Sequence, residues 1–279
     1  MHTPAPTPCD DTATAVDETA LPSSYSLRSH IFPPLANAVI IRSIQKNYYG
    51  SQVNLTGCAV WFAGEVFCHF VVANPGRFRH KACLELGSGA GLTGIVLHKT
   101  ICETICGDEA AGEGSGSGGS KLVLTDGEPE VLSLLRSNCL DNGMVETIEG
   151  GATGDVSLQL LPWGTHDAAR LLLTNPGGFD VIIGCDLFYN RTQEDKVALA
   201  FESVALLLSH ALGAVFVLAF TRRDLDIQTV LDIGHKCGFV AKIVDECTYD
   251  IFGTNTEGLT DFWRDCVYEF SRSPSIISG

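Results

Sequence analysis

The sequence has few basic residues, no paired cysteine motif and no long apolar run, and each absence excludes a class of protein. Only 18 lysines and arginines stand against 33 aspartates and glutamates, a net charge of −15 over 279 residues that disfavours binding to a nucleic acid backbone. No uncharged apolar run approaches the length of a membrane span, and the N-terminus lacks the basic and then apolar pattern of a signal peptide. We therefore expect a globular protein with no membrane or nucleic acid partner.

The eleven cysteines are scattered and odd in number, with no Cys-x-x-Cys among them. This pattern favours reduced thiols, and therefore a cytoplasmic protein, with the nucleus as the alternative compartment. Cys102 and Cys106 lie one helical turn apart, but two thiols alone make an incomplete ligand set for a metal ion. We expect these cysteines to pack as small apolar residues, and we predict no metal site.

Composition divides the chain into a tail and one domain. Residues 1–24 are rich in proline, threonine and alanine with few large apolar residues, which predicts a disordered tail before a single domain over 25–279. Two apolar segments flanking Asn47–Gly50 predict a β-hairpin extension over 37–58. A glycine- and serine-rich stretch at 107–120 predicts a flexible insertion within the domain.

Apolar strand patterns alternate with helical patterns from residue 62 onward. This alternation is typical of an α/β fold, here a Rossmann-like, doubly wound, seven-stranded and mostly parallel sheet. The last two strands follow one another with no helix between them, which predicts an antiparallel hairpin at the sheet edge and so an antiparallel last strand. The expected strands are 82–86, 122–126, 156–161, 179 onward, 214–220, 239–245 and 261–270, and the expected helices are 62–73, 91–106, 129–142, 194–209 and 227–237.

A glycine loop follows the first of these strands, in the segment Leu84-Glu-Leu-Gly-Ser-Gly-Ala-Gly-Leu92. Its glycines allow a tight turn that brings backbone N–H groups to a ligand, and the following helix directs its positive end to the same place. Asp126 ends the next strand, where a carboxylate can hold ribose hydroxyls. The pair predicts a nucleotide site, although an ordinary strand–turn–helix corner would use the same glycines.

The loop distinguishes between nucleotides. The dinucleotide fingerprint requires a third glycine at the position that Leu92 occupies. Glu85, two residues before the first glycine, would repel a pyrophosphate and attract the cationic amino-acid end of S-adenosylmethionine. S-adenosylmethionine is therefore favoured over NAD or FAD.

Four segments together resemble the seven-β-strand protein lysine methyltransferases, the group that includes the enzymes modifying heat-shock chaperones and valosin-containing protein. They are Thr56-Gly-Cys-Ala-Val-Trp61, the glycine loop, Leu124-Thr-Asp126 and Phe179-Asp-Val-Ile-Ile-Gly-Cys-Asp-Leu-Phe-Tyr189, with support from Trp163-Gly164. The resemblance spans about residues 37 to 225. The valine–tryptophan pair and the Asp-x-x-Tyr motif narrow it to this group.

The resemblance implies a set of site residues. Contacts to S-adenosylmethionine would come from Trp61, Glu85, Gly87, Ser88, Gly89, Asp126, Trp163 and Cys185. Asp186 and Tyr189 would lie at the substrate lysine, where Asp186 guides the amine and Tyr189 walls the pocket. The alternatives are core packing for the tryptophans, a strand or helix cap for Asp186, and loop packing for Tyr189.

These observations predict an S-adenosylmethionine-dependent methyltransferase that modifies a lysine ε-amine of a cytosolic protein, such as a chaperone or an ATPase, and that acts as a monomer. Two alternatives stay open: methylation of a small-molecule amine or another side chain, and a non-catalytic binding module that keeps the fold. Methylation of nucleic acid is disfavoured, because Asp186-Leu-Phe-Tyr189 lacks the prolines of the segments that receive a flipped base.

Overall fold

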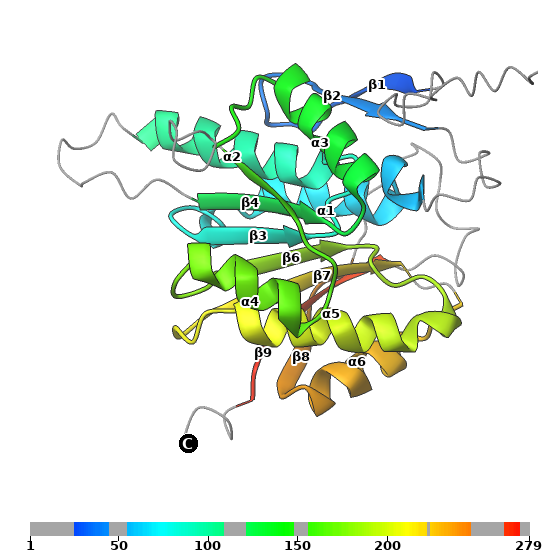
Figure 1. Ribbon diagram of the computed structural model, residues 1–279. Helices are drawn as coiled ribbons and strands as arrows, with labels where there is room; N and C mark the ends of the chain where they lie inside the picture. Colours follow the sequence, from blue (N-terminus) through cyan, green and yellow to red (C-terminus); the bar gives the residue numbers. More distant parts are fainter. Residues whose placement is uncertain are drawn as a thin grey trace, which may run out of the picture.

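A seven-stranded sheet forms the centre of the protein in the computed structural model, which describes residues 25–44, 55–108, 121–147, 156–221, 224–246 and 265–273 (Figure 1). The strand order is β5-β4-β3-β6-β7-β9-β8, and every neighbouring pair is parallel except the two that β9 makes. This confirms the predicted fold class, including the antiparallel last strand. The strands are β3 (Ala82–Leu86), β4 (Lys121–Asp126), β5 (Ser157–Leu160), β6 (Val181–Cys185), β7 (Val215–Thr221), β8 (Phe239–Glu246) and β9 (Asp265–Arg272).

Helices cover both faces of the sheet. Side chains of α1, α2 and α3 share one apolar core with strand residues such as Ile183 and Val217. The residue before each of these, Ile182 on β6 and Phe216 on β7, belongs to the core of the opposite face and packs with α4, α5 and α6. The alternation is that of doubly buried parallel strands. The helices are α1 (Phe62–Ala73), α2 (Leu92–Asp108), α3 (Pro129–Asp141), α4 (Thr165–Thr174), α5 (Glu194–Leu207) and α6 (Ile227–Lys236).

A separate two-stranded antiparallel sheet precedes the seven-stranded sheet in the sequence and lies beside α3 (Figure 1). It pairs β1 (Ser26–His30) with β2 (Val39–Ser43), so the strand predicted within 37–58 has its partner upstream. The predicted downstream partner is wrong at Leu55–Cys58, which forms a 3-10 helix, η1. The physical reason is that this segment turns in against α3: a Cβ on Gly57 would lie 2.9 Å from Val131. Residues 45–54 lie outside the described part.

Two further expectations require correction. The sequence patterns gave no helix at Thr165–Thr174, where α4 packs only Ala168 and Leu171 fully into the core. The insertion expected from residue 107 begins later, because 107 and 108 still belong to α2. The predicted tail, the remainder of the insertion and the expected start of the last strand at 261–264 lie outside the described residues.

The topology defines where a ligand site would form. From β3 the sheet grows outward through β4 to β5 in one direction and through β6 to β7 in the other. In an open α/β sheet, ligands bind beyond the carboxyl ends of the strands at such a reversal. No helix in the described part of the chain is long and apolar enough to cross a membrane.

Candidate functional site

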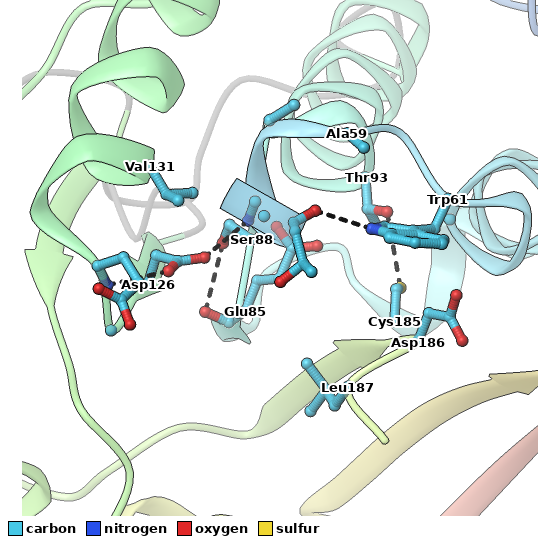
Figure 2. A pocket seen from close by; sticks show the side chains of 18 of the residues that line it. Ala59, Trp61, Glu85, Ser88, Thr93, Asp126, Val131, Cys185, Asp186 and Leu187 are labelled. Atoms are coloured by element: carbon cyan, nitrogen blue, oxygen red, sulfur yellow. Dashed lines mark hydrogen bonds between the residues drawn. The ribbon is translucent and has the colours of Figure 1, made fainter. Parts of the chain in front are cut away.

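A cavity of about 330 Å³ opens at the carboxyl ends of β3, β4 and β6 (Figure 2). All ten residues that the sequence singled out line it, namely Trp61, Glu85, Gly87, Ser88, Gly89, Asp126, Trp163, Cys185, Asp186 and Tyr189. Figure 2 shows Asp126 toward one end of the cavity, Trp61 and Asp186 toward the other, and Glu85 between them. The fold therefore brings five distant segments of sequence into one site.

The glycine loop at the end of β3 has a backbone that side chains would disturb. Gly87, Gly89 and Gly91 have φ values of +59°, +54° and +90°, in the left-handed region that glycine adopts without strain. A Cβ on Gly89 would also lie 2.8 Å from the carbonyl oxygen of Gly57. The loop thus passes directly against the η1 segment, and at Gly89 only glycine fits both its conformation and its neighbour.

Asp126 holds the loop from the end of β4. Its Oδ2 atom accepts a hydrogen bond from the N–H of Gly89 at 3.0 Å, and its Oδ1 atom accepts one from the N–H of Glu128 at 3.1 Å. The side chain is buried, and burial raises its pKa while these backbone donors oppose the rise. Each carboxylate oxygen accepts more than one hydrogen bond, so the residue can serve a ligand as well as the loop.

Glu85 is the most deeply buried carboxyl group of the cavity, with 2% of its surface exposed. Burial, together with a smaller effect of the negative charge of Asp126, raises its pKa to about 8. Within the described residues, its Oε2 atom has no hydrogen-bond partner of normal geometry. A buried carboxyl group without its full set of partners fits a cationic ligand group, such as an ammonium.

Asp186 lies where the chain leaves β6. Its N–H still donates to the carbonyl of Ala219 in the sheet ladder, at 3.0 Å, and the backbone then turns through a φ of +54°. Aspartate and asparagine adopt this left-handed conformation more readily than other non-glycine residues. The turn places a buried carboxylate at the lining of the cavity.

Two aromatic rings line the same end of the cavity as Asp186. The rings of Trp61 and Tyr189 are stacked, with centroids 6.3 Å apart and planes 12° from parallel. The indole N–H of Trp61 donates to the carbonyl of Thr56 at 2.9 Å. The backbone N–H of Tyr189 is held by the Gln193 side chain at 3.4 Å. Both aromatic residues are thus held by hydrogen bonds to other residues of the cavity lining, Thr56 and Gln193.

Trp163 and Leu187 line another wall. Trp163 packs edge-on against Phe188, with ring centroids 5.9 Å apart, and the following Gly164 donates its N–H to the Ser203 hydroxyl of α5 at 2.8 Å. Leu187 contacts the glycine loop closely enough that a Cβ on Gly87 would lie 2.8 Å from it. These contacts give the cavity one flat aromatic surface and one apolar surface.

Cys185 is a neutral thiol in this site. Burial raises its pKa well above the ordinary value, and the Thr93 hydroxyl contacts its sulfur at 3.6 Å. A thiol that stays protonated is a poor nucleophile, so its contribution is packing. Among the described residues, no group of three or more histidine, cysteine, aspartate or glutamate side chains could hold a metal ion.

Several lining residues were not identified from the sequence, among them Gly57, Thr93, Glu128, Val131 and Leu187. Two carried a local signal: Leu187 stands between Asp186 and Tyr189 in the recognised motif, and Glu128 follows the strand-ending acid by two residues. Gly57 also belongs to the recognised Thr56–Trp61 segment, and Thr93 directly follows the glycine-loop segment, whereas Val131 enters the cavity from α3 through a contact that no local pattern reveals.

Comparison with known proteins identifies the family. A model described as lysine methyltransferase matches residues 45–224. The chain belongs to this lysine methyltransferase family. The match contains the glycine loop and every lining residue, so the cavity lies within the part of the chain that the family shares.

Curated relatives of the lysine methyltransferase family match at moderate identity. The human protein-lysine N-methyltransferase EEF2KMT is 27% identical over 224 residues, which are 78% of this chain and 60% of that protein. The calmodulin-lysine N-methyltransferase of Arabidopsis thaliana is 32% identical over 48% of this chain and 36% of its own length. The Danio rerio protein N-lysine methyltransferase METTL21A is 31% identical, over 47% of each. The chain therefore spans between about a third and three fifths of these relatives.

Solved structures agree on the fold. The Thermus thermophilus 16S rRNA N2 G1207 methyltransferase, solved in complex with AdoMet and guanosine, superposes with a TM-score of 0.53 at 14% identity, over 91% of this chain and 52% of its own. An S-adenosylmethionine-dependent methyltransferase structure from Streptococcus mutans gives a TM-score of 0.52 at 10% identity, over 87% of this chain and 55% of its own. At these identities the likeness shows the fold alone.

Proposed function

We propose that this lysine methyltransferase family member transfers methyl groups from S-adenosylmethionine to lysine ε-amines of a protein. The observation that carries the proposal is the pairing of the Asp186 carboxylate with the stacked rings of Trp61 and Tyr189 at one end of the cavity. A carboxylate beside aromatic faces attracts an amine through its charge and through cation–π contact. The opposite end, around Asp126, is left for a nucleoside.

The residues present fit S-adenosylmethionine. Asp126 would hold the ribose, the glycine loop would cover the methionine end with its N–H groups, and Glu85 would face the amino group. Trp163 offers a flat surface beside the adenine, and Trp61 and Cys185 border the methionine end. When bound, S-adenosylmethionine would supply a methyl group from its sulfonium to a neutral amine that approaches in line with the carbon–sulfur bond, and S-adenosylhomocysteine would leave.

The chain's own contribution is alignment. The Asp186 carboxylate accepts a hydrogen bond from the lysine amine and fixes the direction of its lone pair, because the left-handed turn and the sheet hydrogen bond fix the aspartate backbone. The rings of Trp61 and Tyr189 restrict the amine laterally. The lysine proton leaves to solvent, since Cys185 is held neutral and offers no base.

The substrate that we propose is a protein, as the names of the human, plant and fish relatives state for those enzymes. A net charge of −15 suits a target lysine in a basic segment, and a chaperone or an ATPase is our proposed class. We further propose that the protein acts as a monomer in the cytoplasm or nucleus. Seven cysteines of the described part are free thiols, which suits a reducing compartment.

The test is methyl transfer from radiolabelled S-adenosylmethionine to a cell extract by the wild type and by Asp186→Asn, with S-adenosylhomocysteine binding measured for both by calorimetry. Asparagine keeps the size of Asp186 and tolerates its φ of +54°, so the variant removes the charge without straining the turn. We expect methyl-lysine in protein acid hydrolysates from the wild type only, with the affinity of the variant for S-adenosylhomocysteine within about threefold of wild type.

If the label appears only in small molecules, the substrate is a small amine and not a protein. No binding of S-adenosylhomocysteine by folded wild-type protein would overturn the proposal in favour of a non-catalytic module. Full transfer by Asp186→Asn would show that the Asp186 carboxylate is not needed for the reaction.

A further inference from the structure

We propose that Asn138 is a positioning residue for the cofactor loop and couples the N-terminal sheet to it. The inference rests on the cofactor site proposed above. Asn138 lies on α3, with none of its surface exposed and no contact with the cavity. Its amide group donates to the carbonyl of Ala90 in the glycine loop, at 2.8 Å, and to the carbonyl of Arg42 in β2, at 3.0 Å. Its Oδ1 atom accepts from the N–H of Arg42 at 2.9 Å.

Asn142, one turn further along, repeats half of this arrangement. Its Oδ1 atom accepts from the N–H of Ile40 at 3.0 Å, and its amide donates to the carbonyl of Ile40 at 2.7 Å. The two side chains together satisfy the edge of β2 that faces α3, as a neighbouring strand would. The other edge of β2 pairs with β1. The two asparagines differ in what else their amide groups bond: that of Asn138 donates to the glycine loop, and that of Asn142 donates to the backbone carbonyl of Asn138 at 2.8 Å.

The bond to Ala90 fixes a peptide plane of the loop. Because a trans peptide is planar, holding the Ala90 carbonyl also fixes the direction of the Gly91 N–H. That N–H donates to the carbonyl of Ser88 at 2.8 Å and closes the turn. Leu135, one turn before Asn138, packs on the same place, since a Cβ on Gly91 would lie 2.4 Å from its side chain.

The loop is therefore held from two sides. Asp126 holds the peptide N–H of Gly89, and Asn138 holds the carbonyl of Ala90. Asp126 reaches the loop from the neighbouring strand β4. Asn138 bonds both the loop and β2, and β2 contributes nothing to the cavity lining. Loosening the contact with Ala90 would free the loop to adopt other conformations, and cofactor binding would have to restore the bound one.

The matched variants Asn138→Ala and Asn142→Ala test this role. Each removes a pair of hydrogen bonds to β2, so we expect both to lower the melting temperature by several degrees. Only Asn138→Ala also frees the Ala90 carbonyl. At a temperature where both remain folded by circular dichroism, we expect its Kd for S-adenosylhomocysteine to rise about tenfold or more, and that of Asn142→Ala to stay within about threefold of wild type.

Hydrogen exchange on the wild type covers the case in which Asn138→Ala does not fold. Saturating S-adenosylhomocysteine should slow exchange at the Arg42 N–H, which bonds Asn138, more than at the Ile40 N–H, which bonds Asn142. Equal weakening in the two variants, or no added protection at Arg42 while Gly89 becomes protected, would overturn the role of Asn138 alone. Failure of the folded wild type to bind S-adenosylhomocysteine would instead overturn the cofactor site, and this role with it.

Discussion

The Oδ2 atom of Asp126 accepts a hydrogen bond from the backbone N–H of Gly89 at 3.0 Å, so the carboxylate that ends β4 holds the loop that follows β3. Its Oδ1 atom holds the N–H of Glu128 in the same way. The residue expected to bind a ribose is thus also part of the scaffold of the loop. Any change at Asp126 alters both functions.

We expect Asp126→Asn to weaken S-adenosylhomocysteine binding roughly tenfold to a hundredfold. The asparagine oxygen can accept from only one side, so its NH₂ group must face a backbone N–H that Asp126 now satisfies, and hydrogen bonds to a charged group are worth about 1.5–3 kcal/mol. Calorimetric titration measures the change. Glu128→Gln, which keeps the backbone N–H of residue 128, should have a smaller effect. Wild-type affinity in Asp126→Asn would show that the carboxylate does not hold the loop.

Gly89→Ala should abolish cofactor binding while the fold survives. The alanine meets two penalties: a φ of +54°, which costs on the order of 1–3 kcal/mol, and a Cβ only 2.8 Å from the Gly57 carbonyl oxygen. Gly213→Ala is the matched control, because it has a φ of +86° at the amino end of β7 with no atom within 4 Å of the added Cβ. Thermal unfolding and S-adenosylhomocysteine titration distinguish them. Equal binding by both variants would contradict the close passage of the loop against η1.

The stability of the ligand-free protein should depend on pH through Glu85. Its pKa is raised by burial from 4.5 to about 8, so between these values the folded protein keeps a proton that the unfolded chain has released. The free energy of unfolding therefore falls as pH rises over this interval, by at most about 1.4 kcal/mol per pH unit. Glu85→Gln removes this slope.

Urea unfolding of wild type and Glu85→Gln from pH 5 to pH 9 measures the effect. The stability of the variant relative to wild type should grow with pH until about 8 and then level off. Parallel profiles would mean that Glu85 ionises in the folded protein as readily as in the unfolded chain. Other groups that titrate in this range cancel in the comparison, since both proteins contain them.

Tyr189→Phe should keep most of the methyl transfer, and Tyr189→Ala should lose about tenfold in kcat/KM for the protein substrate. The ring that stacks on Trp61 is what bounds the amine, and a cation–π contact is worth roughly 0.5–2 kcal/mol. Steady-state kinetics on the identified substrate gives both values. A large loss of kcat/KM in Tyr189→Phe would show that the hydroxyl group of Tyr189, and not its ring, is needed for transfer.

The elements that the sequence predicted well are those with a local cause. Helix α1 matches at both ends because Trp61 precedes an apolar run that Asn74 and Pro75 terminate, and β3 is a short apolar run before a glycine turn. The partner of β2 was assigned wrongly, because Ser26–His30 carries one apolar residue in five and forms a strand only by pairing. Helix α4 was missed since only Ala168 and Leu171 of it are fully buried.

The site divides in the same way. The family motifs gave ten residues that the fold brings to one cavity, and the family itself is confirmed. The double use of Asp126 and the anchoring of the loop by Asn138 could not be predicted, because each depends on contacts between residues 37 or more positions apart. The roles of the site residues in binding and transfer stay predictions, which the experiments above address.

Among the described strands, the one latest in the sequence, β9, does not lie at an edge of the sheet. β9 pairs with β7 on one side and with β8 on the other, so both neighbours are synthesised before the strand that joins them. Until residue 272 has left the ribosome, β7 has an open edge and β8 has no partner in the sheet. A nascent chain halted before β9 would expose these edges to pairing with other chains. Truncation before β9 would therefore remove the strand that joins β8 to the rest of the sheet, and would leave a product prone to aggregate.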